Sequence, residues 1–249
     1  MEDRPRPRVV VIDDQTVIAL GLAHPSQEVE LVDAFTTVED FLRAPPTPFD
    51  VILLDLQLEG STKATTSPPI MGTAAIRCLL ENGKGPVVVY TTLAEDMLLA
   101  ACLAAGASGA VTKNAPVPTI GEVVRIAANG GMWVDPLVAG ALRRYAERRH
   151  AGALSPQQAN ALRYRGQGLK QKAIADKIGV SDPEIVYRYL KAAVEKLADV
   201  EAETASEPSG KHPSALTDSV AHRSGLATGF VRWEDLQTRP SRRRRKGRR

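Results

Sequence analysis

The chain has 249 residues, of which 43% are hydrophobic and 24% charged, enough for two globular units and a tail. This composition excludes a wholly disordered protein, and no apolar run reaches the ~20 residues that cross a bilayer. The first residues are charged with no apolar stretch behind them, so we predict no secretory signal, no membrane partner and a cytoplasmic location. Residues 1–150 carry 13 Lys and Arg against 18 Asp and Glu, whereas residues 151–249 carry 19 against 11. A polyanionic partner is therefore expected at the second half.

Short apolar runs alternate with longer amphipathic stretches in the first half of the chain. The runs, which we expect to be strands, lie at residues 9–12, 30–32, 51–54, 87–90 and 109–112. Runs that are apolar throughout indicate a sheet covered on both faces, and hence parallel strands joined by helices. Helical spacing at 97–105 and 120–128 fits this role, and Cys78 and Cys102 are expected to be buried free thiols. The sequence therefore predicts a doubly wound α/β fold with a parallel five-stranded sheet.

Four strand ends carry polar side chains. Asp13 and Asp14 follow the first strand, Asp55 the third, Thr91 ends the fourth and Lys113 follows the fifth. A doubly wound sheet gathers these ends at one edge, so three carboxylates and one ammonium are expected to share a pocket.

Three carboxylates in one pocket repel one another unless a cation is present, and oxygen ligands of this kind suit Mg²⁺. A carboxylate beside Mg²⁺ can act as a nucleophile toward a phosphoryl group, while the metal and a lysine neutralise the developing charge. A nearby hydroxyl can then bond the new phosphoryl oxygen.

With these residues in place, the segment of about residues 8–135 resembles a receiver domain of two-component signalling. The resemblance implies that Asp13, Asp14 and Asp55 hold Mg²⁺ and that Asp55 is phosphorylated. It also implies that Thr91 and Lys113 sense the phosphoryl group.

The chain departs from the receiver pattern at three places. Ala110 stands where relatives often have a switching Tyr or Phe, and Gln15 where they often have His. The polar segment 59–69, directly beyond Asp55, is longer than the usual connection and is expected to be a surface loop.

A second compact unit is predicted at residues 154–200. Ser155, Pro156 and Gln158 have the spacing of a helix start with a capping box, and Ser181 with Glu184 repeats that spacing. A short helix over 171–178 lies between them, and a glycine-containing turn joins it to the last helix. Two such helices form a helix-turn-helix, whose second helix enters the major groove of DNA.

The spacing of this unit resembles the LuxR/NarL-type helix-turn-helix, although residues 185–189 depart from the usual Thr-Val-Lys-x-His pattern. A related fold with similar geometry is the fourth region of sigma factors. Arg188 is the first candidate for base contact, because its fork can pair with guanine. The full set of predicted DNA-binding residues is Lys170, Lys172, Ser181, Glu184, Tyr187, Arg188 and Lys191, with the last four expected to face outward where they lie on the helix.

The predicted organisation has four parts along the chain. They are a receiver domain (1–135), a helical linker (136–153), a helix-turn-helix domain (154–200) and a basic, largely disordered tail (201–249). The arginine-rich end of the tail is expected to add non-specific phosphate binding.

We therefore predict a DNA-binding transcription regulator of a two-component system, controlled by phosphorylation of Asp55. Its expected partners are double-stranded DNA, a histidine kinase and a second copy of the chain. An alternative is a phosphorylation-independent regulator whose receiver serves as a dimerisation or partner-binding module. A phosphatase using Asp55 as nucleophile is disfavoured, because Gln57 stands where such enzymes place a second carboxylate, so no enzyme activity is predicted.

Overall fold

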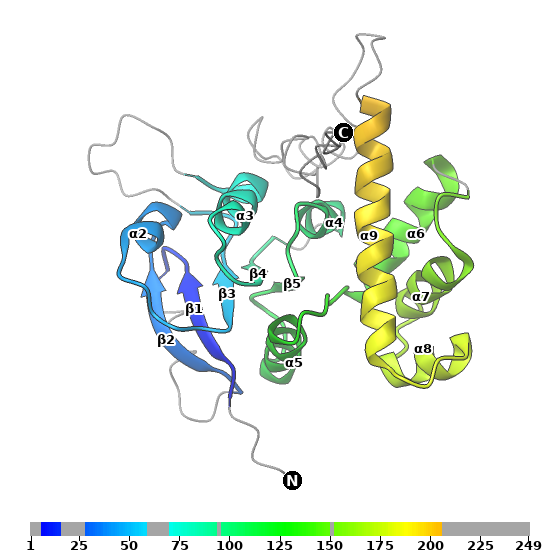
Figure 1. The fold of residues 1–249 in the computed structure, drawn as a ribbon, viewed down its shortest axis with the longest axis horizontal. Coiled ribbons are helices and arrows are strands. Elements are labelled where there is room, and N and C mark those ends of the chain that lie inside the picture. The colour runs from blue at the N-terminus through cyan, green and yellow to red at the C-terminus, as the bar shows by residue number, and fades with distance from the viewer. Residues whose placement is uncertain (1–5, 16–27, 59–69, 94–95, 150–151, 206–249) are drawn as a thin grey trace, which may run out of the picture.

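The computed structural model of the chain describes residues 6–15, 28–58, 70–93, 96–149 and 152–205. Its centre is a parallel five-stranded sheet with strand order β2-β1-β3-β4-β5, which confirms the predicted fold class (Figure 1). The strands are β1 (Arg8–Ile12), β2 (Glu30–Phe35), β3 (Val51–Leu54), β4 (Val87–Thr91) and β5 (Gly109–Thr112). The polar segment 59–69, expected to be a surface loop, lies outside the described residues.

Helices cover both faces of the sheet (Figure 1). They are α2 (Val38–Arg43), α3 (Gly72–Glu81), α4 (Asp96–Ala104) and α5 (Val117–Ala128). Successive strand residues point to opposite faces, so Ile52 and Leu54 join the core under α2, α3 and α4, whereas Val51 and Leu53 join the core under α5. All four of these side chains are fully buried, as the apolar runs predicted.

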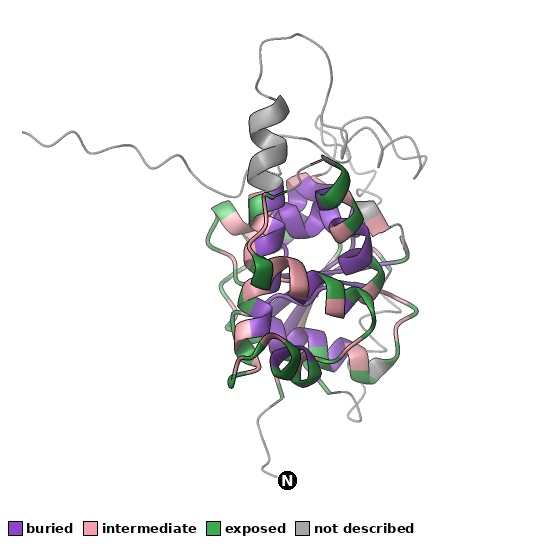
Figure 2. Ribbon diagram, turned by 90° about the vertical axis from the view of Figure 1, so that its right-hand side faces the viewer, coloured by how far each residue is buried: buried purple, intermediate pink, exposed green. Residues whose placement is uncertain are grey.

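Helix α4 is buried on every side. Each residue from Leu98 to Ala105 is at most 4% exposed, although the sequence pattern had predicted only one inward face. Its other faces are covered by α6 (Pro136–Arg149) and α9 (Glu184–Ala205), which belong to the second half of the chain. In Figure 2 the buried residues accordingly run through the interior from the helices near the viewer toward the sheet.

The second half is a packed helical unit of α6, α7 (Pro156–Gly166), α8 (Gln171–Ile178) and α9. The segment predicted as a linker is mostly α6, which lies along both α7 and α4. Helices α6 and α7 touch through their backbones, because a Cβ on Gly166 would lie 3.1 Å from the Cα of Gly140. Helix α9 runs to Ala205, five residues past the predicted end of the domain at 200, and the rest of the predicted tail lies outside the described residues.

One of the two predicted capping boxes is confirmed. The Ser155 hydroxyl accepts from the Gln158 backbone N–H, and the Gln158 side chain accepts from the Ser155 N–H. The second prediction is wrong in its residue, because the Asp182 carboxylate accepts from the Glu184 N–H at 2.9 Å. The reason is Pro183, which lies directly before α9: its carbonyl already accepts from the Val186 N–H, so the first turn starts one residue later than Ser181 would cap.

The two cysteines are free, as predicted, with Cys102 buried and Cys78 half-buried. Burial raises the pKa of the Cys102 thiol to about 12, so this side chain packs as a small apolar group. Within the described part of the chain, no helix combines the length and apolar character that a membrane span requires.

Candidate functional site

The predicted site residues meet at the carboxyl-terminal edge of the sheet. Backbone hydrogen bonds hold each strand end in place: Asp13 N–H donates to the Phe35 carbonyl, Asp55 N–H to that of Ile12 and Lys113 N–H to that of Thr91. These bonds are 2.9, 2.9 and 2.7 Å long, respectively. Each functional side chain is thereby fixed relative to the neighbouring strand.

The Lys113 ammonium bridges two of the carboxylates. Its Nζ lies 2.6 Å from Asp13 Oδ2 and 2.8 Å from Asp55 Oδ2, and all three side chains are at most 5% exposed. Asp14 is half-buried, and one oxygen each from Asp13, Asp14 and Asp55 lie within 4.8 Å of one another. The structure therefore brings together the three carboxylates and the lysine at one point.

Burial and charge act in opposite directions on the ionisation of this cluster. Burial raises the pKa of Asp13, although Lys113 and the Gln15 N–H, which donates to Asp13 Oδ1 at 2.8 Å, partly offset it. Burial by itself would lower the pKa of Lys113, but the hydrogen bonds and charges of Asp13 and Asp55 outweigh it, so that pKa is raised. The ammonium is therefore held in its charged form.

The donor set fits a small divalent cation. Asp13 Oδ2 is buried. Among the described residues it forms the ion pair with Lys113 but no hydrogen bond of good geometry. Three carboxylates carry more negative charge than one lysine can balance, and Mg²⁺ takes one or two carboxylates together with waters and phosphate oxygens. The cluster therefore offers both the charge and the oxygen atoms for such an ion.

Thr91 is fully buried at the end of β4, and its hydroxyl accepts from the Leu93 N–H at 3.3 Å. One contact at this edge was not predicted: the Thr92 hydroxyl donates to the Gln57 side-chain oxygen at 3.2 Å. Gln57 also donates its backbone N–H to Asp55 Oδ1. The one sequence signal for the contact between Gln57 and Thr92 is that Gln57 lies two residues after Asp55, at the same edge of the sheet.

The predicted DNA-binding residues do not all share one exposed surface. Lys170, Lys172, Ser181, Glu184 and Arg188 are exposed around α8 and the start of α9. Tyr187 was expected to face outward, and this was wrong: it is only 7% exposed.

Tyr187 is buried because the first half of the chain covers it. Its ring belongs to the same buried cluster as Ile126 of α5 and Trp133, and burial raises the pKa of its hydroxyl. One turn further along α9, Lys191 is exposed but lines a cavity of about 220 Å³ together with Arg77 and other residues from the first half. The sequence showed the period of α9 but not what packs against it.

Comparisons with known proteins agree with this architecture. The chain is 27% identical to the transcriptional regulatory protein LnrK of Bacillus subtilis, over 77% of this chain and 90% of that protein. It is 28% identical to the response regulator GacA of Pseudomonas aeruginosa, over 77% and 89%. It is 26% identical to the DNA-binding transcriptional activator DevR/DosR of Mycobacterium tuberculosis, over 76% and 88%. No family model matches the chain.

The fold and the site define a receiver-type α/β domain joined to a helical unit with helix-turn-helix geometry. The chain is thus similar, over most of their length, to bacterial proteins named as transcriptional regulators and response regulators.

Proposed function

We propose that the chain is a DNA-binding transcription regulator controlled by phosphorylation of Asp55. The observation that carries this proposal is the cluster of Asp13, Asp14 and Asp55 at the carboxyl edge of the sheet, in which Lys113 bridges the buried Asp13 and Asp55. We assign the metal sites to the three aspartates and phosphate sensing to Thr91 and Lys113. A histidine kinase would be the physiological phosphodonor, and DNA would be bound by two copies of the chain.

The chemistry follows from the charges at the site. Bound Mg²⁺ would neutralise phosphoryl oxygens. A carboxylate oxygen of Asp55 attacks phosphorus, the P–N or P–O bond to the donor breaks, and the leaving group departs with the bonding electrons. Lys113 gives up its ion pair with Asp55 to meet the new negative charge, and the Thr91 hydroxyl donates to a phosphoryl oxygen.

The output side of the proposal rests on α9. Glu184 and Arg188 are exposed, whereas Tyr187 and Lys191 face the receiver half, so part of the helix surface expected to meet DNA is covered. Full DNA contact then requires α9 to move away from α4 and α5, and phosphorylation would favour that movement. DevR/DosR, which aligns over most of this chain, is named as DNA-binding and supports this output.

The residues around Asp55 do not favour a phosphatase. The Gln57 amide, which accepts from Thr92, cannot donate a proton as an acid would. We therefore propose a switch without turnover of external phosphoesters.

The test is phosphorylation by acetyl phosphate and Mg²⁺, followed by intact mass. We expect one phosphoryl group on the wild-type chain and none on Asp55→Ala. Asp50→Asn is the matched control, because Asp50 lies before the same strand, where it accepts from the Arg8 N–H. An unlabelled but folded wild-type protein would contradict the proposal.

A second candidate is a regulator that does not depend on phosphorylation. Ala110, 3% exposed in β5, gives the receiver no aromatic side chain at the position where one could move on phosphorylation. This candidate predicts the same DNA affinity for Asp55→Asn and for wild type treated with acetyl phosphate. A gain in affinity for the treated wild type alone would exclude it.

A further inference from the structure

Arg165 of α7 is a buried cation that is paired with no carboxylate in the described part of the chain. The residue is 8% exposed, yet it forms no ion pair with any acidic residue in the described ranges. Arginine is seldom buried to this extent unless it is paired, because burying a lone charge is costly. Burial accordingly lowers the pKa of Arg165, while Asp135 and Glu122 lie near enough to oppose this through their charges.

The neighbours of Arg165 satisfy only part of its hydrogen-bonding capacity. Its Nε donates to the Val134 carbonyl at 2.7 Å, and one Nη donates to the Leu169 carbonyl at 3.4 Å. The guanidinium lies over the Trp133 ring, 4.1 Å from its centroid. A guanidinium carries five N–H donors, and these two bonds to described residues use two of them.

This guanidinium lines a cavity of about 190 Å³ between the receiver half and the helical unit. Most of the wall is apolar or aromatic, including Trp133 from one side and Ile174 and Tyr187 from the other. Lys170 adds a second positive charge, and Glu122 adds one exposed carboxylate. The lining therefore combines a mostly apolar wall with two cations and one carboxylate, while the charge of Asp135 also acts on Arg165.

We propose that this cavity binds a small organic monocarboxylate with an apolar body, such as one aromatic ring. The planar fork of Arg165 matches a carboxylate in a bidentate pair, and its charge would gain the partner that it lacks. The ring would lie against Trp133 and Tyr187. Because its wall comes from both halves of the chain, the ligand would hold α9 against the receiver.

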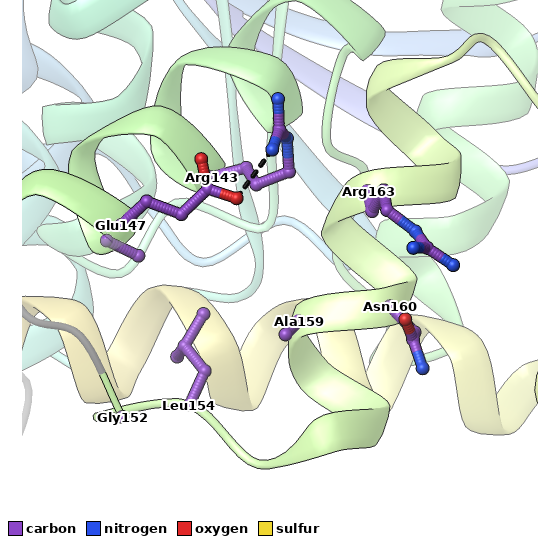
Figure 3. Close-up of a pocket in the computed structure, with 8 residues that line it drawn as sticks. Arg143, Glu147, Gly152, Leu154, Ala159, Asn160 and Arg163 are labelled. Carbon is purple, nitrogen blue, oxygen red and sulfur yellow. Dashed lines mark hydrogen bonds and ion pairs between the residues drawn. The ribbon is translucent and has the colours of Figure 1, made fainter.

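The larger hollow between α6 and α7 is a useful contrast (Figure 3). It has a volume of about 390 Å³, but Arg143 there pairs with Glu147, and the Arg163 side chain is exposed. Arg143 therefore already has a counter-ion, and Arg163 is open to solvent. Arg163, two residues before Arg165 on the same helix, therefore provides a matched control.

The test is calorimetric titration of the full-length chain with benzoate, with benzyl alcohol as a neutral ligand of similar shape. We expect a benzoate dissociation constant of about 1 mM and binding of benzyl alcohol at least about tenfold weaker. Glu122→Gln removes the one lining carboxylate at an exposed position and should tighten benzoate binding by about threefold to tenfold. Arg165→Lys should weaken it about tenfold, whereas Arg163→Gln should leave it unchanged.

Three results would overturn the proposal: no benzoate binding at 20-fold above about 1 mM, equal binding of benzyl alcohol, or loss of binding in Arg163→Gln but not in Arg165→Lys. Inorganic phosphate binding as tightly as benzoate would overturn the assignment to an organic anion. A reduction of DNA affinity by benzoate is also expected; this part rests on the proposed function, whereas calorimetry tests the site without it.

Discussion

Two cations with buried side chains, Lys113 and Arg165, differ in the partners that surround their charges. Lys113 lies between two buried carboxylates at 2.6 and 2.8 Å, at the edge where three strands end. Arg165 is also buried, but its partners are backbone carbonyls and the face of Trp133. The first cation belongs to a charge cluster within one domain, and the second is enclosed only because two units meet.

Each region lacks a charge of a different sign, and this determines which kind of ligand it can bind. At the acidic edge, the carboxylates outnumber the lysine, so the missing charge is positive, and the proposed Mg²⁺ would supply it. At the junction between the two units, where Trp133 and Tyr187 enclose Arg165, no carboxylate of the described residues lies within ion-pair distance of the guanidinium, so the missing charge is negative. One chain therefore carries two regions with opposite electrostatic needs.

The largest effect on stability is expected from Lys113→Met. This change leaves the buried carboxylates of Asp13 and Asp55 facing each other without a cation, so we expect a loss of about 3–5 kcal/mol of stability without Mg²⁺. Added Mg²⁺ should raise the unfolding temperature of this variant more than that of wild type. Lys172→Met, at an exposed position, serves as the control in thermal unfolding with and without Mg²⁺. Equal stability of Lys113→Met and Lys172→Met would show that the bridge contributes nothing.

Tyr187→Ala changes the packing between the two units and leaves the acidic edge intact. Removing a ring buried beside Trp133 and Ile126 should weaken the contact between the two units by about 2–4 kcal/mol and expose α9. Affinity for DNA should then rise several-fold without phosphorylation, as measured by fluorescence anisotropy. Tyr189→Ala, on the same helix and half-buried, should leave the DNA affinity closer to the wild-type value. A fall in affinity for Tyr187→Ala would instead mean that Tyr187 contacts DNA.

Arg165→Met tests whether removing the second cation costs less stability than removing Lys113. The apolar side chain removes a buried charge and leaves no carboxylate without its partner, so only the Val134 and Leu169 carbonyls lose a donor. We expect a loss of no more than about 1–2 kcal/mol, smaller than for Lys113→Met. Both variants should be compared in one urea series. A larger loss for Arg165→Met would show that its hydrogen bonds and ring contact outweigh its desolvation.

The smallest expected effect concerns the exposed start of α9. Asp182→Ala should cost about 0.5–1 kcal/mol, because its carboxylate accepts from the Glu184 N–H, whereas Ser181→Ala should cost close to nothing. Urea unfolding of the pair distinguishes the two caps. The opposite order would restore Ser181 as the cap.

Much of the first half could be predicted because its signals are local. Runs such as Val51 to Leu54 are apolar throughout and are followed by acidic residues, so the sheet and the acidic cluster at its carboxyl edge could be predicted from local sequence. The correction at Asp182 also had a local signal: the rule that identified Ser155 before Pro156 selects Asp182 before Pro183.

The junction could not be predicted in the same way. The burial of Tyr187 and the enclosure of Arg165 depend on how two units pack, and helical period carries no information about a partner surface. One signal was available in α4, where Leu98 to Ala105 is apolar on every face. A helix of that kind needs cover all round, and this pointed to a further layer outside the sheet domain.

The contact between Gly140 and Gly166 has a consequence for how the molecule can bend. Two helices whose backbones touch leave no room for a side chain between them, and we expect α6 and α7 to travel together. Any opening of α9 would then pivot before α6, around Trp133 to Asp135, and not in the short connection after Arg149. A larger side chain at position 166 would wedge the two helices apart and loosen that pivot.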